Sequence, residues 1–213
     1  AQHGGRVYTD AIDNSAGVNC SDHEVNIKIL LNRVVEAGDL TLKQRNDLLA
    51  SMTVEVGRLV LSDNYFQPQA IDVARHRPLY VLDGQQALMQ RLEAAGRLNR
   101  SIEFLPNDEE IAHRKTRKQG LTAPEDAVVL AYAKMAVYDD LVASTLPDDP
   151  HFTRSLQAYF PAVLSERFGD AIATHPLKRE IIATYITNLV LNRMGATFVD
   201  FVSTEVVAST AEV

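Results

Sequence analysis

Apolar residues recur every three or four positions along most of this chain, which is the period of an amphipathic α-helix. The pattern predicts helices near residues 22–37, 41–64, 69–74, 80–95, 107–120, 176–194 and 198–207, with a further long helix opening at residue 122. Before residue 21 the period is lost, and we expect a loop with a short strand at residues 6–9. The predicted fold class is mainly α: a multi-helix bundle or array preceded by a short loop or strand.

Polar residues and glycines mark the ends of these predicted helices. The capping pairs, each with a partner three residues on, are Ser21 with Glu24, Thr41 with Gln44, Asn107 with Glu110 and Thr122 with Glu125. The predicted stops are Gly38, Gly96, Gly120 and Gly195. Prolines at 150, 161 and 176 are expected at first helical positions.

Composition and charge narrow the class of protein. Hydrophobic residues make up 46% and charged residues 23% of the 213 residues, as in ordinary globular domains. The net charge of −7 argues against a nucleic-acid partner, and the basic run at residues 114–118 is interpreted as a solvated last helical turn. No apolar run approaches the ~20 residues that span a bilayer, and no secretory signal is evident. With Cys20 as the sole cysteine, we expect a cytoplasmic protein without an internal disulfide.

Two short patterns could suggest a metal site or a catalytic triad, but the rest of the sequence supports neither. Cys20 and His23 have a C-x-x-H spacing, yet the other histidines are scattered, so we expect no metal site. Ser21, Asp22 and His23 are contiguous, whereas the members of a catalytic triad converge from different elements. We therefore assign no catalytic residue and no metal ligand from these patterns.

The most informative segment is residues 14–24, which reads N-x-x-G-V-x-x-S-x-x-E. Gly17 and its small neighbours would let a flat ligand approach the backbone, and a helix start at Ser21 would suit a carboxylate. An ordinary loop-to-helix junction remains the alternative for this segment alone. The pattern resembles the site of amino-acid dehydrogenases of the glutamate dehydrogenase type, and residues 9–28 are similar to the large bacterial NAD-specific glutamate dehydrogenases. The resemblance continues at residues 41–67, 104–110, 130–134 and 179–184, and weakens between residues 71 and 90.

The resemblance implies a fragment of a longer enzyme. Residues 1–21 would end the catalytic, dinucleotide-binding domain, and residues 22–213 would form a helical C-terminal region. The parent would use NAD to convert L-glutamate to 2-oxoglutarate and ammonia, with an upstream catalytic domain in the same chain and a homo-oligomeric assembly. By position, Ser21 would bind the distal carboxylate of the substrate, Val18 would line its side-chain pocket, and Asn14 would lie near the nicotinamide.

The resemblance assigns a role in the site to these three residues and to no others. The ten glycines never fall as G-x-G, the phosphate-binding fingerprint of a dinucleotide fold, so the isolated chain is predicted to be inactive and to bind NAD poorly. The common shorter enzymes have glycine at the position of Ala16 and an apolar residue at that of His23, and Asp10 and Asp13 are interpreted as turn formers. The competing hypothesis is a free-standing helical interaction or oligomerisation domain without catalytic activity, which would not need the segment at residues 14–24.

Overall fold

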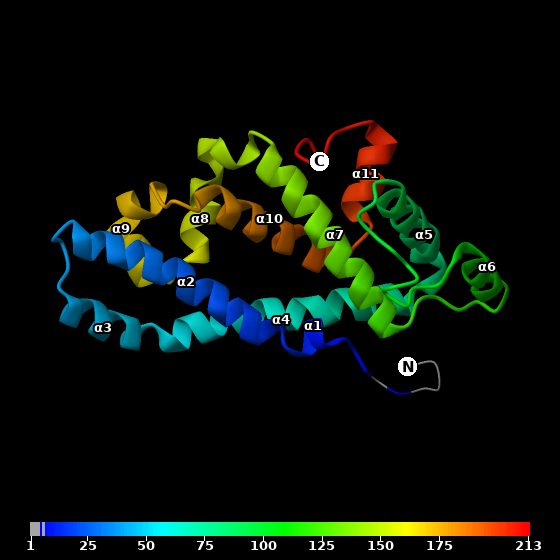
Figure 1. Cartoon of the computed structure of the whole chain (residues 1–213), viewed down its shortest axis with the longest axis horizontal. Helices are drawn as coiled ribbons and strands as arrows, with labels where there is room; N and C mark the ends of the chain where they lie inside the picture. The colour runs from blue at the N-terminus through cyan, green and yellow to red at the C-terminus, as the bar shows by residue number, and fades with distance from the viewer. Residues whose placement is uncertain (1–4, 6) are drawn as a thin grey trace.

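The computed structural model describes residue 5 and residues 7–213. This part of the chain is built from eleven α-helices and two short 3₁₀ helices, and it contains no strand (Figure 1). The helices are α1 (Asp10–Asp13), α2 (Ser15–Glu36), α3 (Leu42–Ser51), α4 (Thr53–His76), α5 (Pro78–Ala94), α6 (Asp108–Thr116), α7 (Ala123–Ala143), η1 (Leu146–Asp148), η2 (Pro150–Phe152), α8 (Thr153–Tyr159), α9 (Ala162–Ala173), α10 (Lys178–Met194) and α11 (Phe198–Val206). The mainly α fold class is confirmed.

Helices α4, α7 and α10 form the middle of the molecule. Helix α10 packs on α7, α4 and α8, while α2 packs on α4 and α9. In Figure 1, α3 and α9 lie at one end of the long axis, and α5 and α6 lie at the other. No helix in the described part of the chain is both long enough and apolar enough to cross a bilayer.

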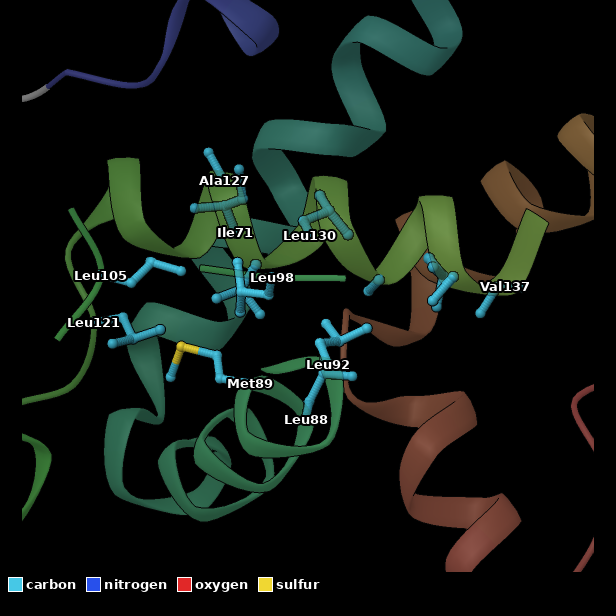
Figure 2. Close-up of a cluster of buried hydrophobic side chains, with 14 of the residues drawn as sticks. Ile71, Leu88, Met89, Leu92, Leu98, Leu105, Leu121, Ala127, Leu130 and Val137 are labelled. Atoms are coloured by element: carbon cyan, nitrogen blue, oxygen red, sulfur yellow. The ribbon is translucent and has the colours of Figure 1, made fainter. Parts of the chain in front are cut away.

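The two ends of the molecule have separate hydrophobic cores. One, here called the α5–α7 core, packs α5 against α7, and Figure 2 shows Leu88, Met89 and Leu92 of α5 lying toward the face of α7 that carries Ala127 and Leu130. The other, the α2–α9 core, is built around side chains of α2, α8 and α9. Helix α10 joins them, because it contributes Ala183 and Leu191 to the first core and Ile181 and Ile182 to the second.

Several helix ends follow the sequence prediction. The Thr41–Gln44 and Thr122–Glu125 capping boxes form, and the Asn107 side chain accepts the N–H of Glu110 at 2.8 Å. Gly38, Gly96 and Gly195 follow helices with φ of +83°, +69° and +89°, a region that glycine reaches without a Cβ penalty. These features were predictable because they depend on residues that are close in sequence.

The predicted start of the first long helix is wrong. Helix α2 begins at Ser15 rather than Asp22, and the single turn α1 precedes it. Residue 6 lies outside the described residues, and residues 7–9 form no strand. The earlier start is stabilised by tertiary contacts: Ser15 is buried, and its hydroxyl accepts a 2.6 Å hydrogen bond from the side chain of Asn64 on α4.

The boundaries predicted between residues 41 and 74 are also wrong. The sequence pattern predicts one helix that reaches residues 63–64, followed by a separate short helix. Instead the chain divides at Met52, and α4 then runs without interruption to His76 with Pro68 inside it. A proline inside a helix costs a backbone hydrogen bond. Burial of Val60 before it and of Ala70 and Ile71 after it offsets that cost.

Three other local predictions need correction. Helix α6 ends at Thr116 instead of Gly120, and Lys118 has a positive φ of 58°. Pro150 does open the 3₁₀ helix η2, but Pro161 immediately precedes α9, and α10 begins two residues after Pro176. The basic run is not wholly solvated either, because the side chain of Arg114 is buried.

Candidate functional site

The three residues predicted to touch substrate and cofactor lie on one face of α2. Asn14 immediately precedes the helix, and Val18 and Ser21 follow it by four and then three residues, a spacing that aligns side chains along a helix. All three are exposed, and the side chain of Val18 is 62% accessible. Val25 continues the same line one turn further and is also exposed. We call Asn14, Val18, Ser21 and Val25 the α2 outer stripe.

The interpretation of Ser21 as a helix cap is wrong. Ser21 lies well inside α2, and its hydroxyl donates to the backbone carbonyl of Gly17 at 3.3 Å. Its expected capping partner, Glu24, forms an ion pair with Lys28 instead. Ser21 is therefore not at a helix start, and the helix dipole does not favour a carboxylate there. The hydroxyl oxygen of Ser21 is still exposed, and the group can rotate to donate to a ligand.

Gly17 serves a different purpose from the one predicted. It belongs to α2 and not to a loop, so its backbone needs no special freedom. A Cβ at this position would lie 2.6 Å from Oδ1 of Asn14. Glycine therefore leaves room for the Asn14 side chain to lie along the first turn of the helix.

The inward side of α2 carries a closed set of hydrogen bonds to α8. The hydroxyl of Tyr159 donates to Oδ2 of Asp22 at 2.6 Å and accepts from Nδ2 of Asn26 at 2.8 Å. The Asn26 amide also donates to Oδ1 of Asp22 at 3.2 Å. Burial, followed by the neighbouring Asp22 carboxylate, raises the pKa of Tyr159, so the hydroxyl stays protonated and remains a donor.

His23 belongs to this inward side and not to a triad. Its ring stacks on that of Tyr159 with centroids 4.3 Å apart, and burial lowers its pKa, so the ring is neutral. Ser21 is exposed while His23 is buried, so neighbours in sequence face different surroundings. Cys20 is exposed, and among the residues that the structure describes no three His, Cys, Asp or Glu side chains are grouped as a metal site would require.

A cavity of about 170 Å³, lined by both polar and apolar side chains, lies between α2, α4, α8 and α10. Asp22, His23 and Tyr159 line one side of it, and Asp63 lines another. Burial raises the pKa of Asp63, while burial lowers the pKa of the nearby Lys134 to about 8. Sequence reasoning missed this cluster because four separate helices build it. The one available signal was a lysine at position 134 among the apolar residues of α7.

Two family models match the chain in succession. The model described as "Bacterial NAD-glutamate dehydrogenase, catalytic domain" matches residues 1–74, and "Glutamate dehydrogenase, C-terminal" matches residues 118–213. An NAD-specific glutamate dehydrogenase from Pseudomonas aeruginosa is 53% identical over 197 residues, or 92% of this chain. The chain belongs to the NAD-specific glutamate dehydrogenase family. This confirms the resemblance inferred from residues 9–28.

Two other NAD-specific glutamate dehydrogenases match over a similar range. The protein from Halomonas elongata is 51% identical over 93% of this chain, and the one from Mycobacterium tuberculosis is 43% identical over 92%. In each case the chain spans only 12% of the length of the curated relative. The two matched segments are not separate bodies, because α2 and α4 from the first pack against α7, α9 and α10 from the second.

Proposed function

We propose that this chain forms the substrate-side edge of the active site in a full-length NAD-dependent glutamate dehydrogenase, together with the helical region that supports that edge. The reaction is the oxidative deamination of L-glutamate to 2-oxoglutarate and ammonia, with NAD⁺ accepting the hydride. The observation that carries the proposal is the α2 outer stripe. The three residues matched to the family's substrate and nicotinamide positions share one exposed face of a rigid helix.

Each of the three matched residues suits the role proposed for it. Ser21 offers a hydroxyl that can donate to the distal carboxylate of glutamate. Val18 offers an apolar surface for the methylene groups of the same substrate. Asn14, with one amide donor group and one acceptor, matches the carboxamide of nicotinamide, which has the same two functions. Their order along the helix would place the cofactor at its first turn and the substrate distal carboxylate two turns on.

The sequence indicates which parts of the active site this chain would supply and which would lie elsewhere in the full-length enzyme. Residues 1–21 contribute side chains to the site, and residues 22–213 support them from behind. The phosphates of NAD and the groups that handle the amino proton would be held elsewhere in the full-length enzyme, since this chain has no G-x-G fingerprint. A homo-oligomeric assembly and a cytoplasmic location remain proposals of the same kind, resting on family membership.

Steady-state kinetics of the full-length enzyme test the role of Ser21. Loss of a hydrogen bond to a charged group is worth ~1.5–3 kcal/mol, so Ser21→Ala should lower kcat/KM for glutamate roughly 10- to 150-fold. KM for NAD⁺ should change little. Because Ser21 is not a helix cap, the substitution removes only a 3.3 Å bond within the helix. Thr204→Ala is the matched control, because its hydroxyl makes the same kind of bond to the carbonyl of Asp200.

Asn14→Ala provides the complementary measurement. It should raise KM for NAD⁺ more than KM for glutamate, which is the reverse of the bias expected for Ser21→Ala. A Ser21→Ala enzyme that melts like wild type and keeps its kcat/KM for glutamate would refute the proposal.

A further inference from the structure

We propose that Tyr159 is a positioning residue for the glutamate site: its hydroxyl fixes the orientation of α2, so that Ser21 on the exposed face of that helix faces the substrate. The inference rests on the proposed function of the α2 outer stripe. It assigns a specific task to the helical C-terminal region, because Tyr159 lies in the segment matched to the C-terminal family model. Tyr159 itself touches neither substrate nor cofactor in this scheme.

The hydrogen bonds of Tyr159 constrain α2 in two directions. Its hydroxyl contacts Asp22 at 2.6 Å and Asn26 at 2.8 Å, and these residues are one helical turn apart on the same helix. Two contacts one turn apart resist rotation of the helix about its axis as well as sliding along it. Asp22 is the immediate neighbour of Ser21, so any movement permitted at Asp22 carries the Ser21 hydroxyl with it.

The ring of Tyr159 makes separate contacts that do not depend on the hydroxyl. It stacks on His23 at 4.3 Å and meets Phe160 edge-on at 5.1 Å. A phenylalanine at this position keeps both ring contacts and removes only the hydroxyl. Tyr159→Phe therefore isolates the positioning contact from the packing of the α2–α9 core, which contains Tyr159 and Phe160.

Two further contacts hold α2 from the same side and show which part of the helix is held in place. Nδ1 of His175 accepts the N–H of Leu177 at 3.1 Å, which leaves Nε2 as the donor to the Asn26 carbonyl at 3.2 Å. Arg33 donates to the carbonyl of Thr174 at 2.5 Å. The contacts with Tyr159, Thr174 and His175 thus fall between residues 22 and 33 of α2, and Tyr159 is the one that reaches nearest to the outer stripe.

The test is a double-mutant cycle in the full-length enzyme with Tyr159→Phe and Ser21→Ala. We expect Tyr159→Phe to raise KM for glutamate about 3- to 10-fold, the scale of one lost hydrogen bond, and to leave KM for NAD⁺ within about 2-fold. In the Ser21→Ala background the same change should have little further effect, because the hydroxyl that Tyr159 positions is already absent. A general loss of stability would reduce the amount of active enzyme without changing KM for one substrate alone.

Tyr132→Phe is the matched control. Its hydroxyl donates to Glu103 at 2.7 Å, so this variant also loses a tyrosine–carboxylate bond, but away from α2. Should Tyr159→Phe fail to accumulate in folded form, Asp22→Asn weakens the same contact from the α2 side with almost no change in shape and takes its place in the cycle.

The outcomes separate the two proposals. If Ser21→Ala is impaired while Tyr159→Phe behaves like Tyr132→Phe, or if the two effects multiply independently, the positioning role is overturned and the proposed function stands. If Ser21→Ala is silent, the proposed function fails and the positioning role falls with it.

Discussion

The side-chain amide of Gln85 donates a hydrogen bond to the carboxyl group of Asp126 across 2.6 Å, in the buried contact between α5 and α7. Burial raises the pKa of Asp126 to about 7, because the Gln85 amide only partly replaces the water that an ionised carboxylate requires. The Gln85 hydrogen bond lowers the pKa in part, Glu125 adds a smaller upward effect, and the charge of Arg75 lowers the pKa slightly. A carboxyl group that ionises near neutral pH inside the protein links stability to pH.

The sign of that linkage gives the first prediction. The folded protein holds the Asp126 proton up to about pH 7, whereas the unfolded chain loses it near the ordinary aspartate pKa of 3.8. Between these values the folded state binds more protons, so this group lowers the free energy of unfolding as pH rises. Asp126→Asn removes the effect. Its stability relative to wild type should therefore increase by about 2–3 kcal/mol between pH 5 and pH 8 in urea denaturation. A difference that does not change with pH would contradict the buried, protonated carboxyl.

The second prediction concerns the buried ion pair of Arg114 and Glu125. The guanidinium donates to both carboxylate oxygens, at 2.7 and 2.9 Å, and joins α6 to the first turn of α7. Glu125→Gln leaves the buried Arg114 charge with only the half-exposed Glu110 carboxylate as its ionic partner, so it should lower the free energy of unfolding by about 3 kcal/mol. The control is Glu24→Gln in the exposed Glu24–Lys28 pair, which should change little. Equal effects of the two substitutions in chemical denaturation would rule out the buried pair as a special contact.

The third prediction compares two glycines. A Cβ placed on either Gly195 or Gly57 would have no neighbouring atom within 4 Å, so alanine meets no clash at either position. Gly195 follows α10 with φ of +89° and ψ of 167°, a region that alanine avoids at a cost of about 1–3 kcal/mol. Gly57 lies inside α4, where alanine should stabilise the helix by roughly 0.5–1 kcal/mol. Thermal melting should thus shift in opposite directions for Gly195→Ala and Gly57→Ala. A shift of the same sign would contradict this backbone assignment.

The fourth prediction is that the purified 213-residue chain does not reduce NAD⁺ with glutamate. It carries the α2 outer stripe but no phosphate-binding glycine fingerprint, so we expect it to bind the dinucleotide poorly. Absorbance of NADH at saturating substrate provides the measurement. Turnover that co-purifies with the chain through successive columns would overturn this expectation.

The sequence was sufficient for several features that depend on near neighbours. The capping boxes at Thr41 and Thr122 and the stop at Gly195 were predicted because each involves a few consecutive residues. The start of α2 was not, since it depends on the contact of Ser15 with Asn64, 49 residues away. Small and polar residues at positions 14–17 suggested a loop, but tertiary contact overrides such a local preference.

The same distinction applies to the candidate site. The positions of Asn14, Val18 and Ser21 could be selected by resemblance, yet their common face became visible only once α2 was seen to begin at Ser15, directly after Asn14. The contact that supports α2 could not be predicted, because Tyr159 and Asp22 are 137 residues apart and no sequence pattern links them. A single tyrosine in an amphipathic helix gives no indication of its partner.

The most direct test of the central claim is a structure of the full-length enzyme that contains this chain, with NAD⁺ and 2-oxoglutarate bound. The α2 outer stripe should line the ligand pocket, with Oγ of Ser21 at hydrogen-bonding distance, about 2.5–3.0 Å, from the distal carboxylate of 2-oxoglutarate. The nicotinamide carboxamide should lie beside Asn14. An α2 outer face that is open to solvent or covered by another subunit, with both ligands bound elsewhere, would contradict the account.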